Sequence, residues 1–510
     1  MRLLSWRAAA LALVVVAPAF AVTSAGCGSD PSVPPPAADA SADTIADMGA
    51  DMGADAGVDT TVDTSADIRA DTRPPMPDAE AGGPHPDGEA GTPSDSGTDT
   101  GSGSDTGTDT GSGSDADSGT TLPTPIRYVF VVVKENHTFD NYFATFPGAD
   151  GTLQATLSNG TVVSLMPAPD VLPSDLGHGH GTALTAWNNG GMNGFDLANP
   201  VMLPGGGFET FTYYTQAQIP NYWAYAQSFV LCDEFFTTVL GPSFPGHLSP
   251  VAAQSPGYNN PAGNWGCNTA YGVGTVETYT PGSCQIGTTS PSCFAIPSVV
   301  DALPAPLTWR AYGNVLTSGE LAVPFEAIQS IGSAGGTLPA HFRNVTSLLS
   351  DLGAGDMANV TYVDTYPPGL SEHPPSNPCP GENYTVQIVN AIMQGPHWNE
   401  SAIVVTWDDW GGFYDHVAPT IDTCTSGGPF NTGFRVPALI ISPYARTAIL
   451  HTPTEQASIP KLIEDLFGMP RMNLRDPNAR DARAGSLLPA FDFTQAPRAP
   501  LILTPRATCP

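Results

Sequence analysis

Basic residues are scarce in this chain. Only 17 of its 510 residues are Lys or Arg, against 49 Asp and Glu, and the formal net charge is −32. A protein that binds nucleic acid neutralises several backbone phosphates with Lys and Arg. The composition therefore argues against nucleic acid as a partner.

The one apolar stretch at the N-terminus is too short and wrongly flanked for a lasting membrane span. Residues 1–26 carry two arginines, then an apolar stretch from Ala8 to Val22, then small residues, which is the pattern of a secretory signal peptide. Ala25, Gly26 and Cys27 resemble a bacterial lipobox, in which the cysteine becomes the lipidated N-terminus. We therefore expect an exported lipoprotein of the cell envelope, attached to a membrane surface by a lipid anchor. Ordinary cleavage and release as a free secreted protein is the alternative.

Core-forming residues are missing between about residues 27 and 120. Aspartate recurs at every fourth position from Asp39 to Asp71, and Gly, Ser, Thr and Pro fill much of the remainder. Like charges four residues apart oppose a helix, so we expect a disordered, self-repelling linker. Between residues 28 and 120 there are 20 acidic and two basic residues, so −18 of the formal −32 belongs to this linker. The acidity of the whole chain therefore says little about the remaining domain, residues 121–510.

Cysteines are few, and their spacing matches no zinc pattern. Seven of the eight lie after Cys27, where an exported protein can form disulfides. We expect the pairs to be Cys267 with Cys284 or Cys293, and Cys379 with Cys424. The odd number leaves at least one cysteine unpaired unless it links two chains.

The segment from Ala402 to His416 is the most informative in the chain. An apolar, β-branched run ends at Asp408 and Asp409, and a Gly-Gly turn and a histidine follow. Adjacent buried carboxylates repel each other, so a cation is needed beside them, and a divalent metal is the economical candidate. A solvated turn after a core strand is the alternative.

A second segment has the same design. The β-forming run from Tyr128 to Lys134 ends at Glu135 and Asn136. The carboxyl ends of strands in an α/β sheet line the ligand crevice, so oxygen ligands about 270 positions apart in the sequence can meet at one ion. The alternative for Asn136 is a helix N-cap after the strand.

At these residues the chain resembles a known family: the bacterial phosphoesterases that include phosphatidylcholine-type phospholipases C and a group of acid phosphatases, within the alkaline-phosphatase-like superfamily. The resemblance extends over roughly residues 125–495 in ordered blocks. These blocks are Val131–Gly151, Asp175–Phe195, Cys232–Leu248, Ser371–Pro375, Ile403–Val417, Gly433–Arg446 and Ser458–Asp476.

The resemblance implies an α/β fold, a three-layer α/β/α sandwich around a largely parallel central sheet. Its expected strands are Tyr128 to Lys134, Val360 to Asp364, Ile403 to Trp407 and Ala438 to Ser442. The segment Ser458 to Phe467 has Leu and Ile at helical spacing and should pack on that sheet.

The resemblance also implies a serine nucleophile. The family's nucleophilic Thr or Ser aligns on Ser243, between Gly and Pro residues that favour a turn exposing the hydroxyl. Where the family usually has Asn, this chain has Gly246. We expect Ser243 to share one divalent metal ion with Glu135, Asn136, Asp408 and Asp409. Ca, Mg or Mn suits these oxygen ligands better than Zn.

Histidines complete the expected site. His178, in the family's Asp-x-x-His block, and His373, in its Glu-His-Pro block, are assigned to phosphate binding and acid catalysis. Three further residues are expected to orient the imidazoles or the ion without contacting the substrate: Asp175, Glu372 and His416. For Asp415 and His416, bracing of a loop is an equal alternative. We interpret His180, His247 and His451 as surface or packing histidines.

The expected activity is metal-dependent hydrolysis of a phosphate ester through a phosphoserine. Our first hypothesis is phospholipase C-type cleavage of a phospholipid, and our second is acid phosphatase activity on phosphomonoesters. A surface-tethered binding protein with a decayed site is the alternative of another class. The sulfatase Cys-x-Pro-x-Arg motif is missing. Six aromatic residues near the site blocks could cage a choline group or simply pack the core: Trp187, Tyr213, Tyr214, Tyr222, Trp223 and Trp265.

Overall fold

The computed structural model describes residues 124–263, 265–267, 273–279, 286–314, 324–365, 368–420 and 432–510. The chain divides into two units, Met1–Thr110 and Gly111–Pro510, and every described residue belongs to the second. The predicted signal peptide, the linker, Cys284 and Cys424 lie outside the described residues.

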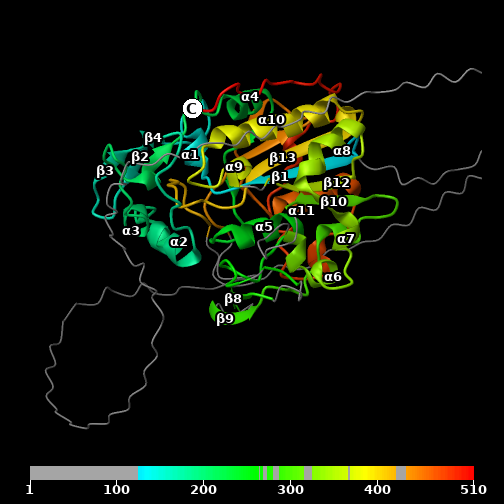
Figure 1. Ribbon diagram of the computed structural model, residues 1–510, viewed down its shortest axis with the longest axis horizontal. Coiled ribbons are helices and arrows are strands. Elements are labelled where there is room, and N and C mark those ends of the chain that lie inside the picture. The colour runs from blue at the N-terminus through cyan, green and yellow to red at the C-terminus, as the bar shows by residue number, and fades with distance from the viewer. Residues whose placement is uncertain are drawn as a thin grey trace, which may run out of the picture. The chain divides into compact units, whose positions relative to one another are not determined.

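Runs of β-branched and aromatic residues form an eight-stranded sheet (Figure 1). In spatial order its strands are β11 (Phe342–Asn344), β10 (Trp309–Gly313), β12 (Val360–Asp364), β1 (Tyr128–Lys134), β13 (Ser401–Trp407), β14 (Ala438–Ile441), β6 (Val230–Cys232) and β15 (Ala448–Leu450). Among these eight described strands, only β14 runs against the others. The four predicted strands are thus confirmed as β1, β12, β13 and β14, with ends shifted by at most two residues.

The centre of the sheet explains the continuous apolar runs in the sequence. Strands β1 and β13 pair in parallel along their whole length, with Val131 opposite Val404 and Lys134 opposite Trp407. Every residue of β13 is buried. A parallel strand covered on both faces has no solvent side, so its sequence does not alternate between apolar and polar residues.

Helices cover both faces of the sheet (Figure 1). The helices α4 (Pro220–Ser228), α8 (Leu348–Ala354), α9 (Pro368–Ser371) and α10 (Pro378–Gln394) form one layer, and α5 (Ser243–Ala252) and α11 (Ser458–Phe467) belong to the other. The bounds of α11 are those predicted, and Ile459, Leu462 and Leu466 on its apolar face are fully buried. The predicted three-layer sandwich is confirmed.

Short elements connect and flank the layers. They are α1 (Phe139–Phe143), α2 (His180–Trp187), α3 (Phe195–Ala198), α6 (Gln329–Gly332), α7 (Leu338–His341), β2 (Gln154–Thr156), β3 (Val162–Ser164), β4 (Met166–Pro167), β5 (Thr212–Tyr213), β7 (Phe235–Phe236), β8 (Thr275–Tyr279), β9 (Ile286–Pro291) and β16 (Thr454–Glu455). Among the described helices, none combines the length and apolar character that a membrane crossing requires.

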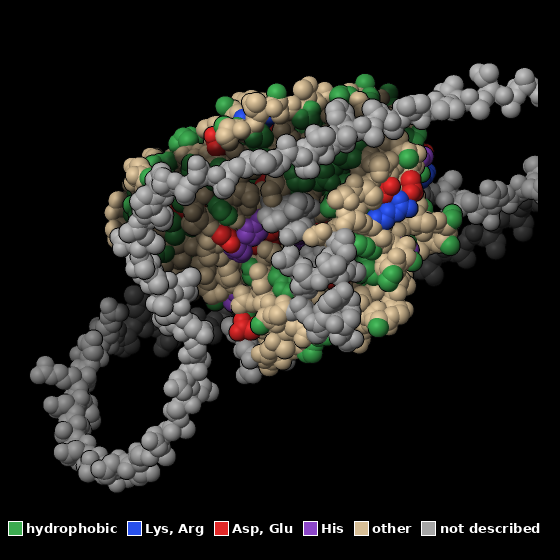
Figure 2. Space-filling view, viewed as in Figure 1, with side chains coloured by type: hydrophobic (Ala, Val, Ile, Leu, Met, Phe, Trp, Pro, Cys, Tyr) green, Lys and Arg blue, Asp and Glu red, His purple; other side chains and the backbone are tan. Residues whose placement is uncertain are grey.

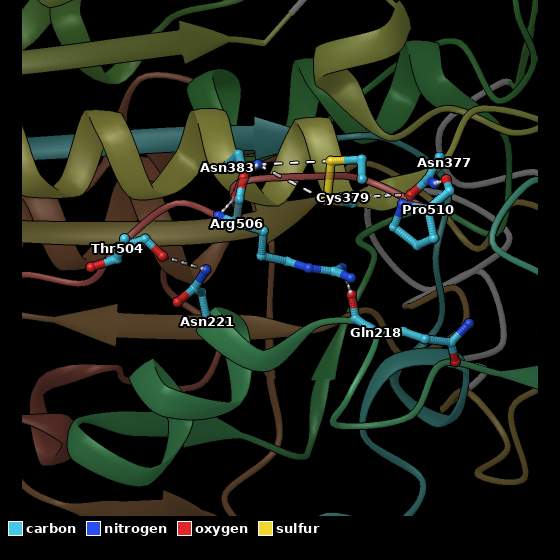
Figure 3. The surroundings of a disulfide bond; sticks show 9 residues. Gln218, Asn221, Asn377, Cys379, Asn383, Thr504, Arg506 and Pro510 are labelled. Carbon is cyan, nitrogen blue, oxygen red and sulfur yellow. Dashed lines mark hydrogen bonds between the residues drawn. A yellow bond between two sulfur atoms is a disulfide. The ribbon is translucent and has the colours of Figure 1, made fainter.

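The last residues of the chain lie along α10 and are fixed by a disulfide (Figure 3). Cys379 pairs with Cys509, so the predicted pairing of Cys379 with Cys424 is wrong. The side chain of Asn383 accepts from the backbone N–H of Arg506 at 2.6 Å and donates to its carbonyl at 3.0 Å, and Asn390 pairs in the same way with Leu503. Tertiary hydrogen bonds thus bring Cys509 to α10, which cysteine spacing cannot reveal.

The other described disulfide joins Cys267 to Cys293, one of the two partners expected for Cys267. Cys232, the last residue of β6, is buried and free. The burial of its thiol raises the pKa of Cys232 well above the ordinary value, so this cysteine is an unreactive part of the core.

Candidate active site

The ends of β1 and β13 bring the two predicted ligand segments together. The backbone N–H of Asp408 donates to the carbonyl of Lys134 at 2.9 Å, which continues the pairing past both strands. The backbone N–H of Asn136 then donates to Asp408 Oδ1 at 2.8 Å. Asn136 itself has a φ of 61°, and Thr138 caps the helix α1 instead, so the N-cap alternative for Asn136 is wrong. Residues 272 positions apart are therefore neighbours at one edge of the sheet.

The predicted nucleophile lies beside these carboxylates. Ser243 is the first residue of α5, and its Oγ donates to Asp409 Oδ2 at 3.1 Å. The other oxygen of Asp409 accepts from the backbone N–H of Gly411 at 2.7 Å, which fixes the carboxylate. The Ser243 side chain is therefore oriented by a buried acceptor that is itself held in place.

Glycine at position 246 has a steric reason in this chain. A Cβ atom there would lie 2.2 Å from the carbonyl oxygen of Asp408, closer than any real contact. The first turn of α5 thus packs directly on the backbone of the Asp-Asp segment, and this close approach places Ser243 within hydrogen-bond distance of Asp409. The departure from the family's usual Asn is a packing feature of this chain.

His247 is the residue that sequence reasoning missed. Its Nε2 lies 2.9 Å from Glu135 Oε1 and 3.6 Å from Asp408 Oδ2, and its Nδ1 lies 3.9 Å from Asp364 Oδ2. Burial alone would lower the pKa of His247, but the surrounding carboxylates raise it to about 10. Our interpretation as a packing histidine is wrong. The signal in the sequence is its position four residues after Ser243, on the same face of a helix.

The three carboxylates of the site do not titrate alike. Burial raises the pKa of Asp408 to about 7, and the nearby Glu135 adds to this effect. Burial and the adjacent Asp408 raise the pKa of Asp409 well above its ordinary value. Burial also acts to raise the pKa of Glu135, but the contact with His247 outweighs it and lowers that pKa to about 2. Such divergent values within one cluster are typical of functional sites.

Two buried oxygens of this cluster have no hydrogen-bond partner among the described residues: Asn136 Oδ1 and Asp408 Oδ2. Buried polar atoms in native proteins almost always have a hydrogen-bond partner, so these two oxygens are exceptions that need an explanation. Carboxylate and amide oxygens are the ligands of hard divalent cations. Glu135, His247 and Asp408 also place ligand atoms within 4.8 Å of one another. The residues therefore fit a divalent metal ion.

The histidines of the two predicted blocks also lie at this edge. His178 donates from Nδ1 to the carbonyl of Leu176 at 2.7 Å, and His373 donates from Nδ1 to that of Pro374 at 2.7 Å. Their ring centres are 6.0 Å apart. With its proton on Nδ1, His178 uses Nε2 to accept from Asn136 Nδ2 at 3.3 Å.

The environments of the two rings shift their pKa values in opposite directions. Burial lowers the pKa of His178. Burial acts in the same direction on His373, but Glu135 overcomes it and raises the pKa. Asp175 is half exposed, with Oδ1 3.7 Å from His178 Nδ1. Of the two imidazoles, His373 therefore holds a proton more strongly than His178 does.

Glu372 and His416 lie apart from this edge. The buried Glu372 carboxylate pairs with Lys134 Nζ at 3.1 Å and accepts hydrogen bonds from Tyr142, Tyr222 and Trp407. It therefore balances the buried charge of Lys134, and, contrary to our expectation, none of these contacts joins the Glu372 carboxylate to an imidazole of the site or to its oxygen ligands.

Asp415 and His416 belong to a second cluster around Arg435, which we call the arginine cluster. The fully buried Arg435 contacts Asp415 Oδ1 at 2.9 Å and Asp140 Oδ1 at 3.4 Å. His416 Nδ1 lies 2.6 Å from Asp140 Oδ2. Of the two readings left open for Asp415 and His416, this geometry favours the bracing of a loop.

A cavity of about 590 Å³ adjoins the site. His178 and Pro242, the residue before Ser243, line it. None of the six aromatic residues named above is among its described lining residues. Tyr214, Tyr222 and Trp223 are buried in the main core, so for these three the packing alternative holds. On the face drawn in Figure 2, histidine and acidic side chains gather in one area.

A serine hydroxyl oriented by a buried carboxylate, with histidines and oxygens that fit a divalent ion around it, is an arrangement typical of hydrolases. The comparisons identify the particular family. The model of the Phosphoesterase family matches residues 126–470, so the chain belongs to this family and is a hydrolase acting on phosphate esters.

Several curated proteins are similar along most of the described chain. Phospholipase C A of Mycobacterium tuberculosis is 27% identical over 428 residues, covering 73% of this chain and 78% of the relative. Non-specific phospholipase C1 of Arabidopsis thaliana is 24% identical, covering 73% and 72%. Non-hemolytic phospholipase C of Pseudomonas aeruginosa is 25% identical, covering 72% of this chain and 57% of the relative.

A solved structure of a protein in the alkaline phosphatase superfamily from Vibrio parahaemolyticus is also similar to this chain. The superposition covers 68% of this chain and 68% of the other, at 11% sequence identity and a TM-score of 0.33. The likeness is weak, and the three layers described above rest on the strands and helices of this chain.

Proposed function

We propose that the protein is a metal-dependent phospholipase C that works through a phosphoserine on Ser243. The observation that carries this proposal is the hydrogen bond from Ser243 Oγ to Asp409 Oδ2, at 3.1 Å, beside the unpartnered oxygens of Asn136 and Asp408. The similarity to three phospholipases C supports it.

A divalent ion would be held by Glu135, Asn136, Ser243, Asp408 and Asp409, with His247 as a further candidate ligand. Such an ion lowers the pKa of a hydroxyl and offsets the negative charge of phosphoryl oxygens. Asn136 is prepared for this role because His178 holds its Nδ2 and leaves Oδ1 available. The oxygen-rich donor set suits Ca, Mg or Mn.

The residues of the chain can carry both halves of the reaction. Ser243 Oγ attacks phosphorus, its proton passes to Asp409, and the bond from phosphorus to the glycerol oxygen breaks. His373, whose pKa is raised by Glu135 against the effect of burial, gives its proton to that leaving oxygen. Water then attacks the phosphoserine and gives a proton to His373, Asp409 returns its proton to Ser243 Oγ as the phosphorus–Oγ bond breaks, and the phosphorylated head group leaves.

The volume of the adjoining cavity favours a diester over a phosphomonoester. Once its alcohol has left, a phosphomonoester has only the phosphoryl group on the enzyme, which needs no space of about 590 Å³ beside it. A phosphodiester carries a second substituent, which remains on phosphorus after the lipid leaves and needs such a space.

The test is turnover by the purified protein on phosphatidylcholine vesicles and on p-nitrophenyl phosphate, after EDTA treatment and after addition of Ca, Mg or Mn. We expect metal-dependent release of phosphocholine, and an acid quench during turnover of phosphatidylcholine should leave the mass of one phosphocholine group on the Ser243 peptide. Ser243→Ala should lose both signals. Ser249→Ala is the matched control, because Ser249 lies in the same helix and donates to the carbonyl of Pro245.

The other outcomes have definite meanings. Turnover of the monoester alone would make the protein an acid phosphatase. A protein that turns over neither substrate with any of the three metals and binds none of them would be a surface-tethered binding protein with a decayed site. Full turnover in EDTA would contradict the metal assignment.

We also propose that the protein is exported and lipidated on Cys27, because residues 1–27 carry a signal-peptide pattern ending in a lipobox-like sequence. The long acidic linker would then extend the enzyme from a membrane surface. Expression in a bacterial host should place the wild-type protein in the detergent phase, and Cys27→Ala should shift it to the aqueous phase. Equal partitioning of the two would contradict lipidation.

A further inference from the structure

The walls of the cavity beside Ser243 come from three parts of the chain. They are the loop from Asp175 to Gly179, the residues around Asn259, and the hairpin of β8 and β9. Pro242 joins the cavity to the proposed nucleophile, since it directly precedes Ser243. A substituent that stays on phosphorus after attack by Ser243 can therefore enter this cavity.

The charge of these walls is of one sign. Asp175 and Glu277 both line the cavity, while the described lining residues include no Lys or Arg. Two carboxylates close to a phosphoryl site would repel an anionic or strongly electron-rich substituent. They favour a substituent that carries a positive charge.

The chemistry of the walls also distinguishes between kinds of cation. A quaternary ammonium has no hydrogen to donate and is bound best by aromatic faces. The described lining residues contain no Phe, Tyr or Trp. A primary ammonium has three N–H donors and is matched by oxygen acceptors. Carboxylate and amide oxygens are what Asp175, Glu277 and Asn259 provide.

The acceptors on the hairpin side are held in place. Asn259 Oδ1 accepts from the backbone N–H of His180 at 2.9 Å, which fixes the orientation of the amide. Its Nδ2 then donates to Glu277 Oε2 at 2.6 Å. A carboxylate has about four acceptor sites, so this bond orients Glu277 and leaves capacity for a ligand.

We propose that this cavity selects a phosphodiester whose head group ends in a primary ammonium, in preference to one that ends in a quaternary ammonium. This inference rests on the proposed function, because it places the head group of the substrate next to Ser243. Asp175 and Glu277 supply the charge-assisted hydrogen bonds that a quaternary head group cannot form.

The experiment compares three soluble substrates with the full chain: the p-nitrophenyl esters of phosphorylethanolamine and phosphorylcholine, and p-nitrophenyl phosphate. The soluble esters remove any effect of a membrane surface. We expect kcat/KM for the ethanolamine ester to exceed that for the choline ester by about tenfold, the size of a charged hydrogen bond that only one of them forms. Most of the difference should lie in KM.

Variants at the hairpin make the test specific. Glu277→Gln should lower the ratio of the two kcat/KM values toward one, and Glu277→Lys should lower it further by repelling both cations, with the larger loss on the ethanolamine ester. Glu277 is exposed, so both substitutions are compatible with folding. Glu400→Gln, which changes an exposed carboxylate outside the cavity lining, is the control and should leave the ratio as in the wild type.

Each outcome decides one of the two proposals. A wild-type ratio at or below one, or a ratio that Glu277→Gln leaves unchanged, would overturn the head-group inference while the diesterase stands. Turnover of p-nitrophenyl phosphate alone would overturn the inference and leave a phosphatase. Failure on all three esters in the presence of Ca, Mg and Mn would remove the proposed function, and the inference with it.

Discussion

Two clusters of buried carboxylates lie along the same two segments of this chain. Glu135 and Asp408 begin the active-site cluster, and Asp140 and Asp415, a few residues further along each segment, begin the arginine cluster. The arginine cluster has its own cation, since Arg435 contacts both of its carboxylates and is fully buried. The active-site cluster contains His247, whose pKa the carboxylates raise to about 10, yet Asp408 Oδ2 and Asn136 Oδ1 still have no hydrogen-bond partner among the described residues.

The difference between the two clusters distinguishes carboxylates with a structural role from carboxylates that can bind a ligand. Buried carboxylates that have a permanent cation are part of the packing, and removal of that cation leaves uncompensated charge. Buried carboxylates with unpartnered oxygens hold space for a ligand whose binding then stabilises them. A residue's distance from a motif in sequence does not tell which of the two roles it has.

The largest contrast should come from removing one carboxylate charge in each cluster. We expect Asp408→Asn to lower kcat/KM by about 10³-fold, because a proposed oxygen ligand with a negative charge becomes a neutral amide. Its thermal stability in EDTA should not fall, since burial and Glu135 already raise the pKa of Asp408 to about 7 and penalise its charged form. Turnover and thermal unfolding of the purified variant measure both effects.

Asp415→Asn is the matched variant for that measurement. We expect it to lower the unfolding temperature, because Arg435 loses its contact at 2.9 Å, and to retain kcat/KM per folded molecule. If Asp415→Asn abolished turnover in a fully folded protein, the arginine cluster would belong to the catalytic machinery.

Removal of the permanent cation is the next largest effect. Arg435→Met should lower the free energy of unfolding by about 3–5 kcal/mol, the usual consequence of leaving buried charges without a partner. Added divalent metal should not restore this loss, because the proposed metal site lies in the other cluster. Denaturant unfolding with and without metal checks it, and rescue by metal would show that the two clusters are one.

A third buried carboxylate, Glu382, shows how much stability burial costs a carboxylate outside the two clusters. Burial raises the pKa of Glu382 to about 7, and its Oε2 has no described partner. The folded state therefore binds this proton more tightly than the unfolded state. Its contribution to stability is present below the unfolded pKa of about 4.5 and is lost as the pH rises toward 7, by roughly 3 kcal/mol.

Glu382→Gln should flatten that part of the stability curve. The measurement is the free energy of unfolding between pH 4.5 and 7.5 in EDTA, with the exposed Glu400→Gln as control. An unchanged slope in Glu382→Gln would mean that the carboxylate is ionised at neutral pH in the folded protein.

The smallest contrast compares a histidine from each cluster. His247→Gln should lower kcat/KM by about 30-fold to 100-fold, because His247 contacts both Glu135 and Asp408. His416→Gln should change it by less than about threefold, because His416 contacts the arginine cluster. Equal losses in the two variants would contradict the separation of the clusters.

Local patterns were sufficient for the elements that carry the site. The bounds of β1 and α11 are those predicted, because a continuous β-branched run and a 3.6-residue apolar period are local signals. The meeting of Asn136 with Asp408 also followed from a local rule, since parallel strands end at one edge of a sheet.

Roles that depend on side-chain direction could not be predicted in this way. Glu372 and His373 are neighbours in sequence, yet the carboxylate of Glu372 lies with Lys134 while His373 lies with His178. Glu372 has a φ of 76°, a left-handed backbone conformation that the sequence does not predict. The directions of the His247 and His416 side chains, toward Glu135 and Asp140 respectively, are likewise not visible in the sequence.

Periodicity, strand ends and family motifs are enough to predict the fold class, the enzyme class and the two segments that carry the proposed oxygen ligands, because each of these signals is local in the sequence. The folded chain alone reveals which carboxylates pair with Arg435, which oxygens have no hydrogen-bond partner among the described residues, and where Cys379 and Cys509 meet. Those outcomes depend on contacts between segments far apart in the chain. Charge compensation in a buried site acts through a few ångströms of space, whatever the separation in sequence.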